Sequence, residues 1–542
     1  MLEGLMQHDF PLTLQHVRDR MRTLYADSEI VSVRDGERSR ANYGEVVGRA
    51  DRLASALEGL GISAGDRVAT FMWNTREHFE VYLAVPCMGA VLHTLNVRLF
   101  AEQLTYIVNH AEDRVIVVDG SLVPVLEELA PTFETVEHYL VVGDADTGSL
   151  PNAVSYEELL AEQSESFDYP ELDDRQAAGL CYTSGTTGNP KGVLYSHRSK
   201  LLHALGQCMA DSMGLHADDR VMPVVPMFHA NAWGIPYGSA ATGADLVMPG
   251  ADLSAEALCT LITEERVTFS AAVPTIWMDL LRYADEHQPD LSGMRLVISG
   301  GSAVPLALMQ ELEKSHGLRI VQAWGMTETS PLGSVARPPG DAEGDEHWRY
   351  RATAGRPSPL VEVRIVDDDG NEVPWDGRST GELEARGPWV ARQYFRDDES
   401  EAKFNAGWLR TGDIAAIDER GYILISDRAK DVIKSGGEWI SSVELEVEIM
   451  AHPAVQEAAV IAVPHERWGE RPLACVVLEE DAELTLEELR DHLAERVAKW
   501  WLPDEVAIVD EVPKTSVGKF DKKVLRRRLE EGRLERLEPA SP

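Results

Sequence analysis

The chain has 542 residues, of which 44% are hydrophobic and 26% are charged. This length corresponds to several packed units and this composition to ordinary globular cores, which excludes a single small binding module and wholesale disorder. No stretch approaches 18 uninterrupted apolar residues, and no basic segment followed by an apolar block opens the chain. We therefore expect a cytoplasmic protein without a spanning helix or signal peptide. The five cysteines form no C-x-x-C pair and are expected to be small core residues.

The charge balance is strongly acidic: 91 acidic residues against 51 basic ones give a formal net charge of −40. Such a charge repels nucleic acid and anionic membrane surfaces, so neither is expected as a partner. Only 11 of the basic residues are lysine, and none precedes Lys191. At molar salt the screening length falls to about 3 Å, which removes most of the self-repulsion, so the composition predicts a halophilic protein. An acidic protein whose excess charge only aids solubility is the alternative.

Short β-branched runs alternate with amphipathic stretches between about residues 40 and 330, and helical periodicity is clear from Ser254 to Glu265. The alternation predicts an α/β fold with two parallel-type sheets flanked by helices. Strands are expected at residues 67–73, 114–120, 179–184, 220–227, 267–274, 294–301 and 319–325.

The pattern changes twice farther along the chain. Residues 350–427 hold close-set strand candidates and turn signals, which predicts an antiparallel β subdomain. The elements expected after it are a hairpin at 431–440, helices from about Ser442 and near 485–499, and strands at 458–464, 474–480 and 506–513. We therefore expect a large N-terminal domain, residues 1–427, and a small mobile α+β domain, residues 428–542, joined at a hinge between Ser426 and Val432.

A loop rich in glycine and hydroxyl groups directly follows the strand expected at 179–184. Such loops expose backbone N–H groups and hydroxyls to phosphate oxygens, and a lysine adds a point charge. Pro190 stands where a Walker A loop needs glycine, so the loop is not of that type. A solvated turn of the same composition remains the alternative. The candidate phosphate-binding residues are Thr183, Ser184, Gly185, Thr186, Thr187, Gly188 and Lys191.

Further motifs follow in a fixed order. They are Gly300-Gly-Ser-Ala303, Trp324-Gly-Met-Thr-Glu328, Gly412-Asp413, Asp427-Arg-Ala-Lys-Asp431, Lys434-Ser-Gly-Gly437 and Pro513-Lys-Thr-Ser-Val-Gly-Lys519. With the loop, they make the chain resemble, over nearly its whole length, the adenylate-forming superfamily of acyl-CoA synthetases, luciferases and peptide-synthetase adenylation domains. The segments Val225–Trp233 and Lys434–Ser441 look most like fatty acyl-CoA synthetases.

The resemblance implies an acid–thiol ligase with a two-step reaction. A fatty acid carboxylate attacks the α-phosphate of ATP to give acyl-AMP and pyrophosphate, and the thiol of coenzyme A then displaces AMP. Mg²⁺ is the implied cofactor, and a homodimer is possible. Because both transition states gather negative charge, the site needs cations and oriented donors more than a protein nucleophile.

The resemblance also assigns roles to single residues. Lys519, Thr327, Glu328 and His229 are the expected catalytic residues, with Glu328 and Thr183 placed at the metal. Asp413 is suited to accept the ribose hydroxyls. Trp324 stands where many relatives carry tyrosine, which keeps an aromatic platform but loses the phenol. The other residues expected near the nucleotide are Gly301, Ser302, Ala303, Gln322, Gly325, Met326 and Arg428.

The acyl chain and the second step are assigned in the same way. Apolar and small residues suit a hydrocarbon tunnel, although ordinary core packing has the same composition. The expected acyl-pocket residues are His229, Trp233, Gly234, Ile235, Pro236, Gly238 and Trp439. The residues expected at the coenzyme A step are Lys434, Ser435, Gly436 and Gly437, and Lys430 is the expected hinge.

Other functions remain open at this stage. A ligase for an aryl or methylthio-alkanoate acid is the nearest alternative, because the acyl pocket is the part that sequence specifies least. A luciferase-like oxygenase and a carrier-protein loading domain fit less well. A non-enzymatic acyl-nucleotide sensor would be expected to carry a damaged loop or lysine motif, and both are intact.

Overall fold

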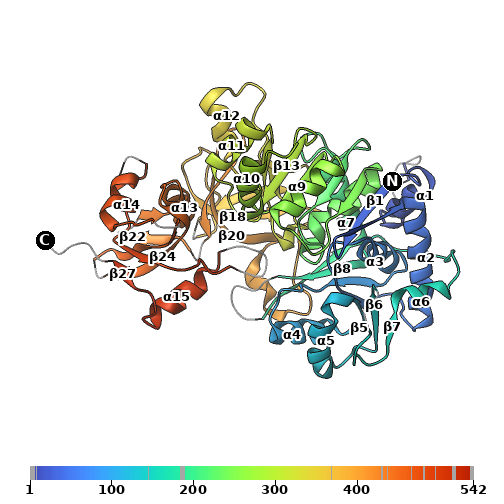
Figure 1. Cartoon of the computed structure of the whole chain (residues 1–542). Helices are drawn as coiled ribbons and strands as arrows, with labels where there is room; N and C mark the ends of the chain where they lie inside the picture. Colours follow the sequence, from blue (N-terminus) through green and yellow to red (C-terminus); the bar gives the residue numbers. More distant parts are fainter. Residues whose placement is uncertain are drawn as a thin grey trace.

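The computed structural model describes residues 6–7, 9–143, 146–183, 189–367, 369–428, 431–435, 438–465, 467–479, 482–494, 496–514 and 520–537. These residues form four sheets. Figure 1 shows the elements from α1 to α11 in one body, coloured from blue to yellow-green, and the C-terminal elements in red at the opposite end of the molecule. The fold is α/β, as expected, with an antiparallel sheet between these parts.

One sheet has seven strands in the order β7-β6-β5-β3-β4-β8-β9. All its pairs are parallel except β8 with β9. Its strands are β3 (Arg67–Phe71), β4 (Val91–Thr94), β5 (Asp113–Asp119), β6 (His138–Val142), β7 (Ala153–Ser155), β8 (Ala177–Tyr182) and β9 (Gly192–Ser196). The accompanying helices are α2 (Tyr43–Gly59), α3 (Arg76–Cys87), α4 (Ala101–Ala111), α5 (Val123–Leu129), α6 (Tyr156–Ala161) and α7 (His197–Cys208).

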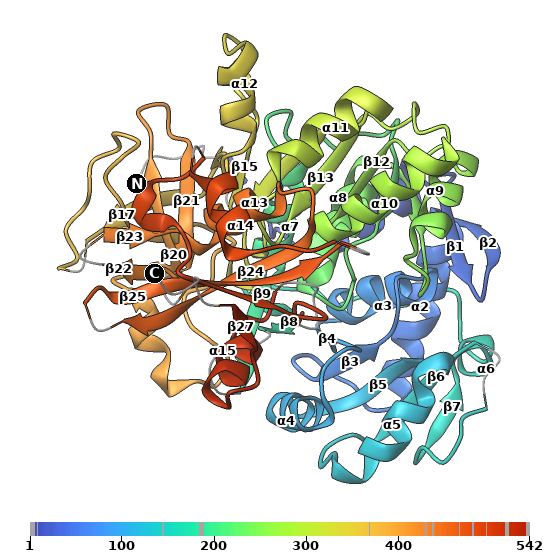
Figure 2. The same ribbon diagram turned by 60° about the vertical axis from the view of Figure 1, so that its left-hand side comes forward.

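The second sheet has nine strands in the order β16-β15-β14-β13-β12-β10-β11-β1-β2, parallel from β14 to β1 and antiparallel at both edges. Its strands are β1 (Glu29–Arg34), β2 (Glu37–Asn42), β10 (Arg220–Pro223), β11 (Asp245–Met248), β12 (Phe269–Ala272), β13 (Leu296–Gly300), β14 (Ile320–Trp324), β15 (Ser334–Val335) and β16 (Arg356–Pro357). Its helices are α1 (Gln15–Thr23), α8 (Ile235–Thr242), α9 (Ala255–Glu264), α10 (Pro274–His287), α11 (Leu306–His316) and α12 (Gly344–Arg351). Helix α12 projects from the body in Figure 1 and in Figure 2.

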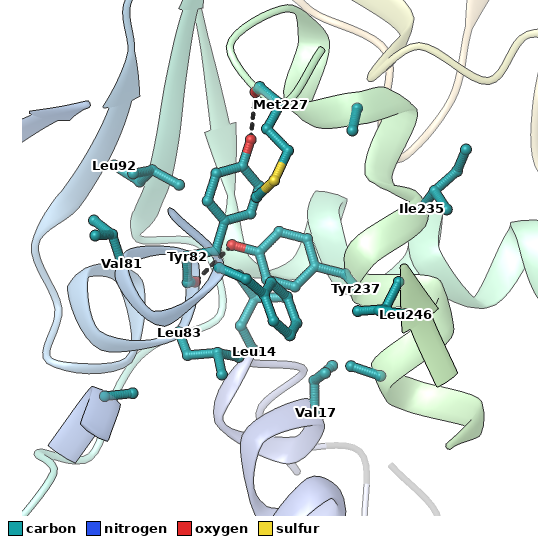
Figure 3. Close-up of a cluster of buried hydrophobic side chains, with 14 of the residues drawn as sticks. Leu14, Val17, Val81, Tyr82, Leu83, Leu92, Met227, Ile235, Tyr237 and Leu246 are labelled. Atoms are coloured by element: carbon teal, nitrogen blue, oxygen red, sulfur yellow. Dashed lines mark hydrogen bonds between the residues drawn. The ribbon is translucent and has the colours of Figure 1, made fainter. Parts of the chain in front are cut away.

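An apolar core joins these two sheets. Helix α3 from the first sheet packs its buried face toward α8 from the second, and Figure 3 shows Tyr82 and Tyr237 meeting there. The Tyr237 hydroxyl donates to the carbonyl of Tyr82 over 2.8 Å, and the Tyr82 hydroxyl donates to the carbonyl of Met227. The two parallel-type sheets therefore share one core.

Two more sheets complete the chain. The antiparallel sheet holds β17 (Glu362–Val366), β18 (Gly381–Arg386), β19 (Phe404–Asn405), β20 (Trp408–Ile417) and β21 (Ile423–Arg428). The C-terminal sheet holds β22 (Ile433–Ser435), β23 (Glu438–Ile440), β24 (Val455–His465), β25 (Gly469–Leu478), β26 (Glu505–Ile508) and β27 (Arg536–Leu537). The helices α13 (Ser442–Met450), α14 (Leu486–Leu493) and α15 (Lys522–Glu530) accompany it.

The strands expected from sequence are present, with ends that differ by a few residues. The run 220–227 ends early, at Pro223, in a segment that carries a second proline, Pro226, without an N–H to donate to a ladder. Strand β20 is not among the strands expected from sequence; it runs through Gly412, which has φ of +75°. Four of the five cysteines are buried and Cys208 is half-buried, which confirms their core role. None of the helices in the described part of the chain has the length and apolar character to cross a bilayer.

Candidate active site

The candidate phosphate loop is closed at its base by Thr183 and Lys191. The Thr183 N–H donates to the carbonyl of Lys191 over 2.9 Å, and the Lys191 N–H donates to Thr183 Oγ1 over 3.2 Å. The pair sits where β8 ends and β9 begins, so the loop emerges at the edge of the seven-stranded sheet. The loop residues Ser184, Gly185, Thr186, Thr187 and Gly188 lie outside the described residues.

Lys191 is oriented by a segment just over two hundred residues away in the chain. Its ammonium forms an ion pair with Asp397 over 2.7 Å and lies 5.1 Å from the centre of the Tyr394 ring. The segment is tied to β9, because the Phe395 N–H donates to the carbonyl of Gly192 over 2.8 Å. Sequence reasoning missed Tyr394 and Asp397, since a tyrosine and an aspartate in an irregular segment carry no periodic signal.

Glu328 lies in a short 3-10 turn, Thr327–Thr329, that follows β14. Its side chain is buried, and Oε1 accepts a 2.7 Å hydrogen bond from the Tyr394 hydroxyl. Burial, and after it the Glu328 charge, raises the pKa of Tyr394, so the phenol stays a donor. The carbonyl of Thr327 accepts from the Tyr195 hydroxyl over 2.8 Å. Lys191, Glu328 and Tyr394 thus form one cluster in which cation, anion and phenol have fixed positions.

Asp413 lies beside Trp324. The indole Nε1–H of Trp324 donates to Asp413 Oδ2 over 2.9 Å, and the carboxylate residue is only 2% exposed. Strand β20 brings Asp413 into register with Arg428 of β21, whose side chain lies outside the described residues. The indole N–H of Trp324 therefore orients this carboxylate.

The ends of β13 and β14 approach each other closely. A Cβ on Gly300 would lie 2.8 Å from the carbonyl of Ala323 and 3.4 Å from the ring of Trp233, so only glycine fits. The following loop, with Gly301, Ser302 and Ala303, is held by Gln322.

Gln322 engages backbone groups at both ends of its amide. Its Oε1 accepts from the Val304 N–H over 2.6 Å, and its Nε2 donates to the carbonyl of Thr353 over 2.8 Å. Gln322 therefore positions the adjacent loop. Gly325 is confined as well, because a Cβ there would lie 1.5 Å from the carbonyl of Pro331, and the Met326 N–H donates to Thr329 Oγ1 over 2.9 Å.

The segment after β10 forms an unusual left-handed turn. Ala230, Asn231, Ala232 and Trp233 have φ of +43°, +54°, +49° and +54°, and Gly234 has +74°. This conformation costs roughly 1–2 kcal/mol for each residue that carries a Cβ. Such strain persists only where the surroundings over-determine it, and it is common at binding and catalytic sites.

Polar side chains hold this turn from several elements. Asn231 accepts a hydrogen bond from Lys200 and donates one to the Tyr82 hydroxyl over 3.1 Å. Gln207 donates to the carbonyl of Trp233. The turn begins at His229, which is half-buried and whose N–H donates to the carbonyl of Pro226 over 3.0 Å. The strained backbone of the turn Ala230–Gly234 thus places His229 directly before the turn and Trp233 near its end.

The remaining acyl-pocket candidates on α8 are tightly packed. Ile235, Pro236 and Gly238 are buried, and a Cβ on Gly238 would lie 2.7 Å from Gln207. A Cβ on Gly234 would lie 2.7 Å from His203. The two glycines therefore allow close approach of α7, which is a packing role.

The residues expected at the second step lie in the β22–β23 hairpin. Lys434 and Trp439 face each other in register, and the buried Ser435 accepts a 3.1 Å hydrogen bond from Arg471. The side chains of Lys434 and Trp439 lie outside the described residues, as do Lys430, Gly436, Gly437 and Lys519.

A buried polar cluster joins β21 to the C-terminal helices. Asp427 accepts from the N–H and hydroxyl of Ser442, which begins α13. Lys522 of α15 donates to Ser442 Oγ over 2.6 Å and pairs with Glu446 over 2.7 Å. Burial raises the pKa of Glu446 to about 7, although Lys522 opposes the shift.

Two protein-family models match this chain. The model of the AMP-binding enzyme family matches residues 20–395, and that of the AMP-binding enzyme C-terminal domain matches residues 444–519. A medium-chain-fatty-acid–CoA ligase of Ectopseudomonas oleovorans is 44% identical over 505 residues, which cover 92% of each chain. A 3-methylmercaptopropionyl-CoA ligase of Ruegeria lacuscaerulensis is 44% identical over 523 residues, covering 95% of this chain and 97% of the relative.

Among solved structures, the anthranilate CoA ligase AuaEII in complex with anthranoyl-AMP superposes with a TM-score of 0.87. It is 27% identical, and the match covers 97% of this chain and 100% of that one. A family model that matches more than half of the chain, together with these relatives, decides the assignment. The chain belongs to the AMP-binding enzyme family, and it is an acid–thiol ligase.

Proposed function

We propose that this ligase activates fatty acids. In the first step the carboxylate attacks the α-phosphate of ATP, which forms acyl-AMP and releases pyrophosphate. In the second step the thiol of coenzyme A attacks the acyl carbon, and AMP leaves with its phosphate oxygen. One observation supports this choice: the indole of Trp233 lies 3.4 Å from the Cβ position of Gly300, at the end of β13. An apolar side chain therefore borders the Gly301–Ala303 loop that we assign to the nucleotide.

We assign the binding of the nucleotide to Asp413, Lys191 and the Gly301–Ala303 loop. Asp413, oriented by Trp324, accepts the ribose hydroxyls, a role that a buried carboxylate performs well. Lys191 serves the phosphates, because an ammonium stabilises developing negative charge, and the residues Ser184 to Gly188 are assigned the same role. The small residues of the Gly301–Ala303 loop let the adenine ring approach the backbone.

The oxygen groups of Glu328 and Thr183 suit a magnesium ion. A buried carboxylate and the hydroxyl of Thr183 are hard oxygen ligands, and Mg²⁺ takes one or two carboxylates together with phosphate oxygens and water. Within the described ranges no group of three or more acidic, histidine or cysteine side chains gathers to hold a metal, so the remaining ligands come from substrate and solvent. When bound, the ion neutralises phosphate charge; Tyr394 keeps Glu328 in place.

The two steps use two faces of one small domain. We place the N-terminal domain at residues 1–427 and the mobile domain at 428–542, with Lys430 at the hinge. Lys519 serves adenylation, and the face with Lys434, Ser435, Gly436 and Gly437 serves the coenzyme A step with Trp439 beside the acyl chain. Rotation about the hinge presents each face in turn.

A second substrate class has a specific observation in its favour. The relative named for 3-methylmercaptopropionate is as similar to this chain as the medium-chain fatty acid relative, at 44% identity. A methylthio-alkanoate is short and apolar apart from its carboxylate, so it would meet the same apolar side chain of Trp233.

The experiment is thioester formation measured for carboxylates from acetate to oleate, with benzoate and 3-methylthiopropionate, at several KCl concentrations. We expect kcat/KM to peak at a medium or long fatty acid. A peak at benzoate or 3-methylthiopropionate would overturn the substrate class and leave the two-step mechanism standing. Loss of activity with every acid would overturn the mechanism as well.

A further inference from the structure

Lys200 is a buried lysine that the reaction described above does not use. It lies on α7, is 6% exposed, and its ammonium stands 4.7 Å from the ring centre of Tyr195 and 5.5 Å from that of Tyr237. A Cβ on Gly179 would lie 2.5 Å from its Cε, so strand β8 leaves room for this side chain. Tyr195, Tyr237 and the backbone at Gly179 therefore surround the lysine side chain.

No carboxylate in the described part of the chain forms an ion pair with Lys200. The titratable groups facing it are Cys181, Tyr195 and Tyr237 from neighbouring elements, and His197 and His203 from its own helix. Burial lowers the pKa of Lys200 to about 8. Aromatic faces offset part of the cost of burying an ammonium, but such a cation destabilises a fold relative to an apolar residue. Its retention in a lysine-poor chain indicates a role other than stability.

The hydrogen-bond partner of Lys200 points to that role. The ammonium donates to Oδ1 of Asn231, the second residue of the left-handed turn Ala230–Gly234. The other end of the Asn231 amide donates to the Tyr82 hydroxyl, which in turn donates to the carbonyl of Met227 (Figure 3). This series of hydrogen bonds from Lys200 to Met227 therefore holds the turn at its second residue and holds the segment that leads into it.

We infer that Lys200 is a positioning residue for the acyl pocket: by holding Asn231 it keeps the left-handed turn in place and with it the indole of Trp233. The inference rests on the proposed function, because it assigns the turn to the pocket of the fatty acid. In this role Lys200 acts through Asn231. Lys200 influences the reaction by setting the position of Trp233, which lies beside Gly300 at the end of β13.

The test is Lys200→Met, which keeps the length of the side chain and removes the charge and the donor. We expect the KM for the best fatty acid to rise about tenfold or more, since a hydrogen bond from a charged donor is lost. The KM for ATP should stay within about twofold, and the melting temperature should be unchanged or higher. A purely structural lysine would instead lower the melting temperature and reduce kcat with all substrates.

Matched variants sharpen the result. Lys314→Met, at an exposed lysine on α11, should change neither KM. Asn231→Leu should reproduce the effect of Lys200→Met, and the double variant should be no worse than either single one, because both remove the same contact. Asn231→Asp keeps the acceptor for the ammonium but loses the donor to the Tyr82 hydroxyl, so its KM should rise less than that of Asn231→Leu.

Several outcomes would overturn the inference. An unchanged fatty acid KM in Lys200→Met does so, as do equal rises in both KM values or effects that multiply in the double variant. If Lys200→Met fails to fold, Asn231→Leu decides with the same criteria. Trp233→Ala separates the two proposals: if it raises the fatty acid KM while Lys200→Met does not, the pocket stands and the inference fails. If Trp233→Ala also leaves that KM unchanged, the proposed pocket fails.

Discussion

The hydrogen bond from Trp324 to Asp413 is a single contact with a measurable consequence. In Trp324→Phe the aromatic ring remains while the N–H donor is lost, so the buried carboxylate is less firmly oriented. A hydrogen bond to a charged group contributes about 1.5–3 kcal/mol, so we expect the Kd for AMP to rise about tenfold or more. Isothermal titration calorimetry measures this change. Trp375→Phe, at an exposed tryptophan, is the control, and an equal Kd in both variants would contradict the role of Trp324.

Lys519 is the residue on which the two-step proposal depends most. An ammonium placed at the developing charge in a closed site contributes about 3–4 kcal/mol, so Lys519→Ala should slow acyl-AMP formation by roughly 10² to 10³. With synthetic acyl-AMP and coenzyme A, thioester formation should remain near the rate of the unaltered protein, because the domain has then turned. The control is Lys523→Ala, an exposed lysine on α15.

Rapid-quench measurement of each half-reaction gives the two rates separately. Equal loss of both half-reactions in Lys519→Ala, with an intact melting curve, would show that Lys519 acts in both steps and that domain alternation is wrong for this protein.

At the scale of elements, helix α7 carries two histidines that are held neutral. Nδ1 of His197 accepts from the Leu14 N–H over 3.3 Å, and Nε2 of His203 accepts from the Leu332 N–H over 3.2 Å. Burial, followed by the charge of Lys200, lowers the pKa of His197 to about 4 and that of His203 to about 3. A nitrogen that accepts a backbone N–H cannot also carry a proton, which agrees with these directions.

These histidines make stability depend on pH. Their folded pKa values lie below the unfolded value near 6.5, so the unfolded state binds more protons, and the stability they contribute is present above pH 6.5 and is lost as pH falls toward 4. Between pH 6.5 and 5, His203→Gln should lessen the loss in unfolding free energy by about 2 kcal/mol. Urea unfolding at each pH measures it. His287→Gln, at the exposed end of α10, should leave the pH dependence unchanged, and the same result for His203→Gln would refute the assignment.

The elements predicted best are those whose signal lies within their own residues. The parallel strands appear as short β-branched runs, and α9 begins one residue after Ser254, whose hydroxyl caps it. Strand β20 was missed because Gly412 signals a turn, and only pairing with β18 and β21 on both sides keeps that residue in a strand. The left-handed turn at 230–234 was missed as well, since four of its five residues are not glycine.

The whole molecule carries the net charge of −40, and its consequence is a stability that depends on salt. As KCl rises from 0.1 M to 3 M, the Debye length falls from about 10 Å to below about 3 Å, so repulsion between carboxylates is screened. We expect the midpoint of thermal unfolding to rise steeply over this range. Sorbitol at matched osmolarity is the control, because it is uncharged and screens nothing. A flat or falling midpoint in KCl would remove the case for a halophilic protein.

The sequence by itself determined the α/β class and the order of the motifs, because strand runs and glycine-rich loops are encoded by neighbouring residues. Tertiary structure alone decided which distant groups complete the site: Tyr394 with Glu328, Asp397 with Lys191, and Trp324 with Asp413. These partners lie between 66 and 206 residues apart, and no local pattern encodes such contacts. The fold creates these contacts by packing segments that are distant in the chain against one another. Burial makes the hydrogen bonds of Glu328 and Asp413 necessary, while the Lys191–Asp397 pair stays partly exposed.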